Sequence, residues 1–272
     1  MLSIWKKHSV LIPDYIRLAL RREAEYKVGF YTFILNQLIS ISLWLLFWNV
    51  LMSKIGSFGK WNYEHVIVLT GFVAFNAGLW LTFLFIWRMP VEILTGALNA
   101  HLIKPVHPFL HLIFRRLNLR SFPRMLMGIA IVAYALFHYG LPHDFGSVTL
   151  ATATSLLSFL AVFMPLAMIG LTAFWIGRAE FLRDLFVELF IFQNYPLTEF
   201  PRAFIMFFMF VIPLIFSGTM PVVILTKNFG QWSGYIQSLL IFAALLIIVT
   251  VQLLAFNWIW RAGLRRYESY GG

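Results

Sequence analysis

The 272-residue sequence contains no cysteine and few charged residues. Without cysteine the chain forms no disulfide, offers no thiolate to a metal and has no thiol nucleophile. Charged side chains make up 12% of it, half of the ~25% in an ordinary soluble domain. A soluble globule cannot hide a composition that is 61% hydrophobic, because most of its residues touch water. The composition excludes a cytosolic enzyme, a disordered chain and a secreted disulfide scaffold.

The sequence also lacks the short motifs of nucleotide hydrolysis and of common hydrolases. It contains no GxxxxGK[ST], HExxH or GxSxG pattern, and its one Gly-Lys pair, Gly59-Lys60, is followed by Trp61. A P-loop holds phosphates with the backbone of that missing glycine-rich motif, so this chain cannot bind ATP in that way. We expect no catalytic residue, no metal site and no cofactor bound by this chain.

Long uncharged apolar runs dominate the sequence and predict an all-α integral membrane protein. Five runs are expected to span the bilayer: 30–52, 66–87, 125–140, 149–177 and 236–260. Tryptophans at the ends of several runs are typical of the aromatic belt at a membrane interface. Up to residue 258, these runs contain one ionisable group of the Asp, Glu, Lys, Arg and His types, His138. This scarcity argues against an ion-coupled carrier, which needs a titrating or coordinating site.

A sixth crossing is expected within residues 178–235, and two segments compete for it. Residues 203–225 are uncharged and long enough to span, whereas residues 185–198 are shorter and carry Glu188. If both crossed, the basic tail at 261–272 would lie outside, against the positive-inside rule. One segment is therefore expected to cross and the other to enter and return, and the sequence leaves open which does which. Four prolines favour broken helices there: Pro196, Pro201, Pro213 and Pro221.

The net charge of +10 is better explained by membrane orientation than by nucleic-acid binding, because the basic residues flank apolar runs. With six crossings and both termini in the cytoplasm, 18 of the 21 Lys and Arg residues are cytoplasmic, or 17 if 185–198 is the crossing segment. Both counts predict the same orientation, with the loop at 88–124 also on the cytoplasmic side.

Residues 1–29 are polar and basic, yet Ile12, Ile16 and Leu20 recur at helical spacing opposite Arg17. This pattern predicts an amphipathic helix that lies on the cytoplasmic membrane surface. The alternative is a plain juxtamembrane tail. We see no internal repeat and no separate soluble domain, so residues 1–272 are expected to form a single membrane domain.

A few uncharged polar residues lie inside the predicted spans, namely Asn36, Ser40, Thr70 and Asn76. They are candidates for a substrate path. The alternative is that they join helices through hydrogen bonds, each contributing about 0.6 kcal/mol within a membrane.

Two groups of titratable residues lie outside the main spans. A charge cluster after the fourth span contains Arg178, Glu180, Arg183, Asp184 and Glu188. Glu188 is either a proton or cation site, or a carboxylate at the cytoplasmic interface that pairs with Arg183 or with the neighbours of Asp184. Three histidines share the loop at 88–124: His101, His107 and His111. No thiol or carboxylate completes a ligand set around them, which favours solvated or headgroup-facing histidines over a metal site.

The loop at 88–124 carries the strongest functional signal. Pro90 is tolerated in the first turn of a helix, and Lys104-Pro105 ends one, which predicts a short helix from Val91 to about Ile103. A short cytoplasmic helix between two spans can insert into a groove on a partner and transmit rigid-body motion. The alternative is an interfacial helix without a partner.

The order and spacing of several residues resemble the permeases of ATP-binding-cassette type-2 exporters, in particular the branch related to daunorubicin-type drug exporters. That branch commonly reads I-x-x-G-x-L-D-x-x-L-x-x-P-x-x-P in this loop, and Asn99 stands where it often has Asp. The matching loop residues are Ile93, Gly96, Leu98, Leu102, Lys104-Pro105 and Pro108. Further matches are Tyr195-Pro196-Leu197, Phe200-Pro201, Ile212-Pro213, Pro221 and the C-terminal GLRRYESYGG.

The resemblance implies one membrane half of an exporter, with a re-entrant helix pair before the last span. The loop helix would be a coupling helix that docks on a separate ATPase dimer, which would bind ATP and Mg²⁺, and the N-terminal helix would also touch that ATPase. The coupling residues would be Glu92, Gly96, Asn99, Lys104, Pro105 and Pro108. The second permease half would be a related chain or a second copy.

We therefore predict a permease subunit, multi-pass in the bacterial cytoplasmic membrane, that exports an amphipathic drug, lipid, glycolipid or peptide. A path lined by apolar and weakly polar side chains suits such cargo. Membrane lipid is an expected partner and nucleic acid is not. One alternative function is a passive channel or a scaffold subunit. Another is a membrane-embedded lipid enzyme, for which the charge cluster after the fourth span would have to supply the chemistry.

Overall fold

A computed structural model describes residues 2–141, 144–177, 180–227 and 234–267. This part of the chain is helical, apart from turns and one isolated antiparallel bridge between Phe58 and Trp61. The helices in its first half are α1 (Leu2–Glu25), α2 (Lys27–Ile55), α3 (Tyr63–Thr82), η1 (Leu84–Arg88), α4 (Met89–Leu94), α5 (Asn99–Leu102), α6 (Pro108–Arg115), η2 (Leu119–Ser121) and α7 (Phe122–His138). The second half contains α8 (Phe145–Leu171), α9 (Ala173–Ile176), α10 (Glu180–Glu188), η3 (Leu189–Asn194), η4 (Leu197–Glu199), α11 (Arg202–Met206), η5 (Phe207–Val211), η6 (Leu214–Phe216), α12 (Thr219–Thr226) and α13 (Tyr235–Arg266).

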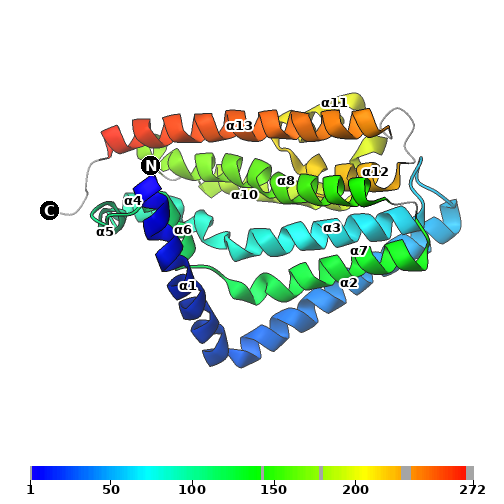
Figure 1. Ribbon diagram of the computed structural model, residues 1–272, viewed down its shortest axis with the longest axis horizontal. Coiled ribbons are helices and arrows are strands. Elements are labelled where there is room, and N and C mark those ends of the chain that lie inside the picture. The colour runs from blue at the N-terminus through cyan, green and yellow to red at the C-terminus, as the bar shows by residue number, and fades with distance from the viewer. Residues whose placement is uncertain (1, 142–143, 178–179, 228–233, 268–272) are drawn as a thin grey trace.

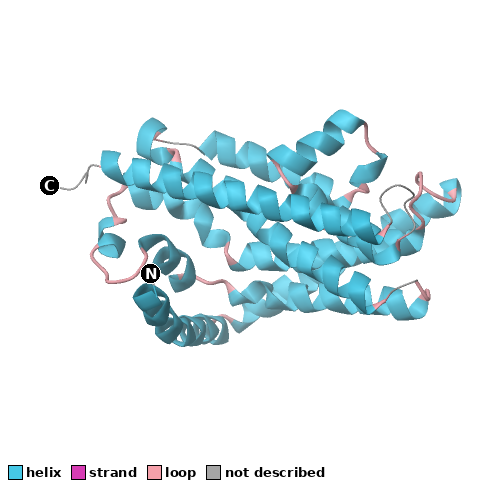
Figure 2. Ribbon diagram, turned by 45° about the horizontal axis from the view of Figure 1, so that its top comes forward, coloured by secondary structure: helices cyan, strands magenta, loops and turns pink. Residues whose placement is uncertain are grey.

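Five helical stretches are long and apolar enough to cross a membrane, and they run side by side (Figures 1 and 2). Their bounds are Lys27–Ile55, Tyr63–Thr82, Leu119–His138, Phe145–Ile176 and Tyr235–Arg266. All five predicted runs are thus confirmed as helices. The third begins earlier than the predicted residue 125, so Arg120 and Arg124 lie within it. The bundle has a loop end, with α4, α5 and α6, and a far end, with residues 56–62 and 139–141 (Figure 1).

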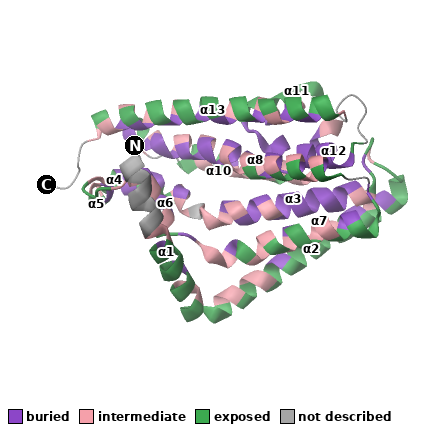
Figure 3. Cartoon of the chain, in the orientation of Figure 1, coloured by how far each residue is buried: buried purple, intermediate pink, exposed green. Residues whose placement is uncertain are grey.

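The helix α3 occupies the centre of the bundle and is buried along most of its length (Figure 3). It packs closely on α7 because glycines face each other at the contact. A Cβ at Gly128 of α7 would lie 2.5 Å from the backbone nitrogen of Phe75 and 2.6 Å from the carbonyl oxygen of Gly71. Small residues that let two backbones approach are the usual basis of helix association in membranes.

The segment after α9 extends along the bundle. Arg183, on α10, lies beside Trp87 and Pro90 at the loop end. The hydroxyl of Thr198, on η4, accepts a hydrogen bond of 2.8 Å from the indole N–H of Trp61 at the far end. Residues 180–199 therefore extend from one end of the bundle to the other. At about 1.5–2.0 Å per residue for α- and 3₁₀-helix, this segment is on the order of 30 Å long.

Residues 202–226 form a hairpin of short helices that starts and ends at the far end. Its tip reaches the middle of the bundle, where the Asn76 amide of α3 donates a 2.9 Å hydrogen bond to the Ser217 carbonyl. The return helix α12 is fully buried and ends at Thr226, and the next residue, Lys227, pairs with Asp144. Asp144 also caps α8 through a hydrogen bond with Ser147. The hydrogen bond from Lys227 has the largest effect on the pKa of the Asp144 carboxyl, and together with the one from Ser147 it lowers that pKa to about 2. The far end is thus held by charge as well as by packing.

Much of the outer surface of the bundle is exposed (Figure 3), and many of the exposed residues are large and hydrophobic. On α2, Leu35, Leu43 and Leu46 are all more than half exposed, and α13 presents Ile247 and Leu254 in the same way. A patch of this extent is unfavourable in water but matches the hydrocarbon of a bilayer.

Candidate functional site

The predicted coupling segment, residues 91–103, folds as two short helices. The prediction of one continuous helix is wrong, because α4 ends at Leu94 and α5 begins at Asn99. Between them Gly96 has a φ of +73°, a left-handed conformation that glycine adopts without steric cost. The backbone N–H of Leu98 then reaches back to the carbonyl of Glu92 at 2.9 Å. Leu98 is buried, so this turn is packed onto the bundle and held in one shape.

Glu92 points into this module and is buried, with 9% of its surface exposed. Its carboxylate lies 4.0 Å from the Arg116 guanidinium and 3.9 Å from His101 Nε2. Burial of the His101 ring lowers its pKa, and the partly opposing effect of Glu92 does not reverse this. The ring is therefore neutral at pH 7, and Arg116 supplies the positive charge that Glu92 requires.

The N-terminal helix α1 is attached to this loop through a buried histidine. The Tyr15 hydroxyl contacts His111 Nδ1, and Lys104 Nζ donates to His111 Nε2 at 2.8 Å. An ammonium has no lone pair, so Nε2 must accept; Nδ1 then carries the proton and donates to the tyrosine oxygen. Tyr15 itself is buried, which raises the pKa of its phenol above the usual value. Lys104, a predicted coupling residue, thus connects α5, α6 and α1.

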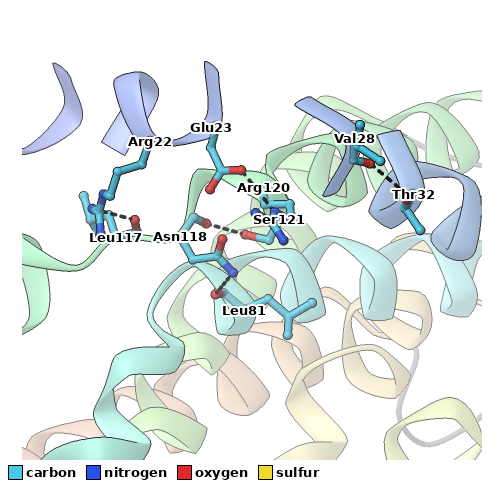
Figure 4. A network of polar contacts seen from close by, with 9 residues as sticks. All are labelled: Arg22, Glu23, Val28, Thr32, Leu81, Leu117, Asn118, Arg120 and Ser121. Atoms are coloured by element: carbon cyan, nitrogen blue, oxygen red, sulfur yellow. Dashed lines mark hydrogen bonds and ion pairs between the residues drawn. The ribbon is translucent and has the colours of Figure 1, made fainter. Parts of the chain in front are cut away.

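A second set of contacts joins the end of α1 to the segment before α7 (Figure 4). Glu23 and Arg120 form an ion pair of 3.1 Å, and the Arg22 guanidinium lies 3.4 Å from the Leu117 carbonyl. The Asn118 amide donates to the Leu81 carbonyl at 3.3 Å, so the same segment is also attached to α3. Through these contacts α1, the loop and the central helix form one connected unit.

Reversing one charge of the Glu23–Arg120 pair should loosen α1. In Glu23→Arg or Arg120→Glu the like charges repel and weaken the attachment of α1 by about 1 kcal/mol, the upper range for a part-exposed ion pair. We therefore expect faster trypsin cleavage after Arg21 and Arg22. The double variant Glu23→Arg/Arg120→Glu restores the opposite charges and should regain most of the protection. If each single variant is as protected as the unaltered protein, the pair does not hold α1.

The outward surface of the loop includes three exposed apolar side chains. Val91 and Leu94 of α4 are each 39% exposed, and Ile103, just after α5, is 84% exposed. These three side chains, called here the apolar tip, lie at the loop end on the frame held by Glu92 and His111. Lys104 and Pro105 are exposed beside them, whereas Pro108 begins α6 and is half-buried.

The four predicted path residues occupy three different environments. Asn76 is fully buried and binds the Ser155 and Ser158 hydroxyls at 2.7 and 3.2 Å, in addition to the hairpin tip. Asn36 is exposed on α2 and accepts a hydrogen bond from Ser40. Ser40 and Thr70, by contrast, line a single cavity of about 170 Å³ between α2 and α3. Packing thus accounts for Asn76, and the cavity brings two of the four together.

The same cavity contains two residues that the sequence reasoning missed, Arg124 and Asn194. Arg124 directly follows Pro123, and this dipeptide reads as the border of an apolar run. A hydropathy pattern places such an arginine at the interface, and only the packing of α7 brings it to the cavity.

The charge cluster and the histidines correct two further predictions. Arg183 pairs with its neighbour Asp184 at 2.7 Å, so the proposed pairing of Arg183 with Glu188 is wrong. Glu180, Asp184 and Glu188 are exposed along α10, and Arg178 lies outside the described residues. His101 and His111 are buried rather than solvated, while the His107 ring lies tilted beside that of Trp260, with 6.1 Å between the ring centroids. Among the described residues no group of three His, Asp or Glu is arranged to hold a metal ion.

Comparison with known protein families identifies the chain. A family model described as "ABC-2 family transporter protein" matches residues 38–271. Neither a curated protein nor a solved structure matches the chain. The matched region runs from α2 to beyond α13 and includes the whole loop with its apolar tip. Because this match covers most of the sequence, and because the chain is a bundle of membrane-length helices, the protein belongs to the ABC-2 family of transporter membrane proteins.

Proposed function

We propose that this chain is the permease subunit of an ATP-driven exporter, and that its apolar tip docks on a separate ATP-binding-cassette ATPase. The observation that carries the proposal is the pairing of an exposed apolar surface with a rigid base. Val91, Leu94 and Ile103 project outward, while Glu92 and His111 bind the same segment inward. A surface that is apolar, small and preorganised fits a groove on a partner protein.

The proposed topology has six crossings, with both termini and the loop end in the cytoplasm. Residues 180–199 would provide the sixth crossing as a broken helix, since they extend over the length of the bundle. Residues 202–226 would form the re-entrant hairpin near the outer leaflet. Its return arm is covered, because α12 packs on α3 and α8 and η6 packs on α8, as an irregular backbone at membrane depth requires. The positive-inside rule supports this orientation, because 16 of the 21 basic residues then lie on the cytoplasmic side, four lie on the other side, and Arg124 lies within a span.

In this mechanism the chain contributes movement and a path, and the ATPase contributes the chemistry. ATP would close two ATPase subunits, and their motion would push the apolar tip. The contacts of Tyr15, Lys104 and Arg120 would transmit that push to α1 and α3 as a rigid body. A second permease half, related or identical, would complete the path for a drug, lipid, glycolipid or peptide.

Charge placed on the apolar tip should separate the two subunits. We expect Leu94→Asp and Ile103→Asp to reduce recovery of an ATP-binding-cassette subunit with the tagged full chain by about tenfold, equivalent to ~1.4 kcal/mol. Both side chains are exposed, so the variants should fold normally. The matched control is Phe145→Asp, an exposed aromatic position at the far end, which should leave recovery unchanged.

The measurement is co-purification from the cells of origin in mild detergent, followed by mass spectrometry and by ATP-dependent uptake into inside-out vesicles. Loss of the ATPase with the tip variants alone supports the proposal. Equal recovery with all variants, or cargo movement that persists without ATP, contradicts it and favours a channel or scaffold instead.

A further inference from the structure

The cavity beside Arg124 is the most informative feature that coupling does not use. Its buried wall is formed by Thr70, Val73 and Ala74 of α3, and its rim by Ser40 and Ile41 of α2. Trp44, Arg124 and Asn194 complete the lining. Ser40 is exposed, so the cavity opens on the side of α2, whereas the α3 wall belongs to the core.

Two residues of the cavity lining carry a buried hydrogen-bond donor that has no acceptor. Within the described residues, Nε of Arg124 and Nε1 of Trp44 are buried without a hydrogen-bond partner. The other polar side chains of the lining are already engaged: Thr70 donates to the Val66 carbonyl and Asn194 to the Ile191 carbonyl. The ion pairs of the described residues all use other basic groups. Buried donors are normally paired, so these two side chains lack an acceptor, and a cation such as Arg124 favours an acceptor with negative charge.

The position of Arg124 along the bundle distinguishes it from an arginine whose side chain extends to the membrane surface and is solvated there. Its neighbour Met125 packs against Gly78, close to the end of α3. The cavity residues Thr70 to Ala74 lie one to two turns further toward the far end. The guanidinium therefore extends from the nearer membrane interface toward the middle of the bundle. An intramembrane charge oriented in this way is costly and marks a functional site.

We propose that this cavity binds the phosphate headgroup of an anionic amphipathic molecule, with Arg124 and Trp44 as the donors and the tail lying against α2. The volume of about 170 Å³ is below the ~300–1,000 Å³ of a site for a whole drug-sized ligand. It admits a headgroup and leaves the tail outside, beside the apolar surface of α2. The proposal deepens the proposed function, because it names the chemical class of cargo that the exporter accepts.

The test measures binding alone and needs no ATPase. The full chain in a neutral maltoside detergent is titrated with dioleoyl phosphatidic acid, dioleoyl phosphatidylcholine or inorganic phosphate, and adducts are counted by native mass spectrometry. We expect phosphatidic acid to bind at least ~10-fold more tightly than phosphatidylcholine, and inorganic phosphate to bind weakly because it has no tail. Arg124→Gln should lose this preference, since a hydrogen bond to a charged group accounts for a difference of this size.

Three variants separate a binding role from a structural one. Arg124→Lys keeps the charge and should bind at an intermediate level. Trp44→Phe removes the indole N–H but keeps a ring against Tyr195, and should weaken binding several-fold. Arg202→Gln removes an exposed arginine outside the cavity and should bind like the unaltered protein. Without lipid, Arg124→Gln should melt at the same temperature as the unaltered protein, whereas phosphatidic acid should stabilise only the latter.

Three outcomes overturn the site: equal affinity for the two lipids, unchanged binding by Arg124→Gln, or binding of inorganic phosphate as tight as that of phosphatidic acid. None of these affects the exporter proposal, because the ATPase can dock on the apolar tip whatever the cavity holds. Conversely, phosphatidic acid binding that requires Arg124 supports the site even if no ATPase is recovered with the chain.

Discussion

Replacing Gly128 by leucine is expected to abolish folding, the largest stability effect in this chain. The first added carbon would lie 2.5–2.6 Å from backbone atoms of Phe75 and Gly71, which no side-chain rotation can relieve. The helices α3 and α7 must then separate. Overpacking by even small groups costs about 1–3 kcal/mol, and leucine adds three further carbons. Because α3 is the core of the bundle, we expect no monodisperse protein from Gly128→Leu in mild detergent.

A graded series checks this prediction. Gly128→Ala should fold but melt at a lower temperature, and Gly128→Leu should aggregate on size-exclusion chromatography. The control is Ala130→Leu, which adds bulk on the exposed side of the same helix and should melt like the unaltered protein. If Gly128→Leu elutes and melts normally, the close contact of α3 with α7 does not exist in the membrane.

Replacing Gly96 by valine is expected to uncouple transport while the protein still folds and inserts. Valine at a φ of +73° is a genuine outlier, and such strain costs about 1–3 kcal/mol, or roughly 5–150-fold in the population of the docked shape. The turn would reopen, the contact between Leu98 and Glu92 would be lost, and the apolar tip would shift. We expect ATP-dependent uptake into vesicles to fall by about tenfold or more.

Two control variants test the backbone strain, one at Gly96 itself and one at another glycine with a positive φ. Gly96→Asn should keep most of the transport, because asparagine tolerates the left-handed region better than a β-branched residue does. Gly140→Val places an equal strain, at a φ of +59°, at the far end and should leave coupling intact. Normal transport by Gly96→Val would show that the turn between α4 and α5 does not transmit motion.

The membrane helices were predictable because their signal is local. A run of about 20 apolar residues is sufficient to indicate a span, and the five predicted runs are all long helices in the structure. The start of α7 was less predictable, since Pro123 and Arg124 resemble the border of a span. The break at Gly96 was also missed, because the periodicity of residues 91–103 suits one helix as well as two.

The candidate site was only partly visible in the sequence. Pro90 and Lys104-Pro105 mark the loop in the sequence, but the sequence predicts solvated or headgroup-facing histidines, whereas His101 and His111 are buried. Glu92 turns inward to Arg116, and Tyr15 contacts His111, which is 96 positions away in the sequence. Both contacts join segments that are separated along the chain. No spacing rule in one sequence reports such contacts.

Composition and run length alone determined that this chain lies in a membrane, how its helices are ordered and which loop is exposed, because the bilayer acts on each segment separately. Only the tertiary structure decided that residues 180–199 extend over the length of the bundle, that Asn76 holds a hairpin, and that Arg124 reaches a cavity. Those outcomes depend on which helix faces pack together. Packing depends on two segments together, so the hydropathy of a single segment does not predict it.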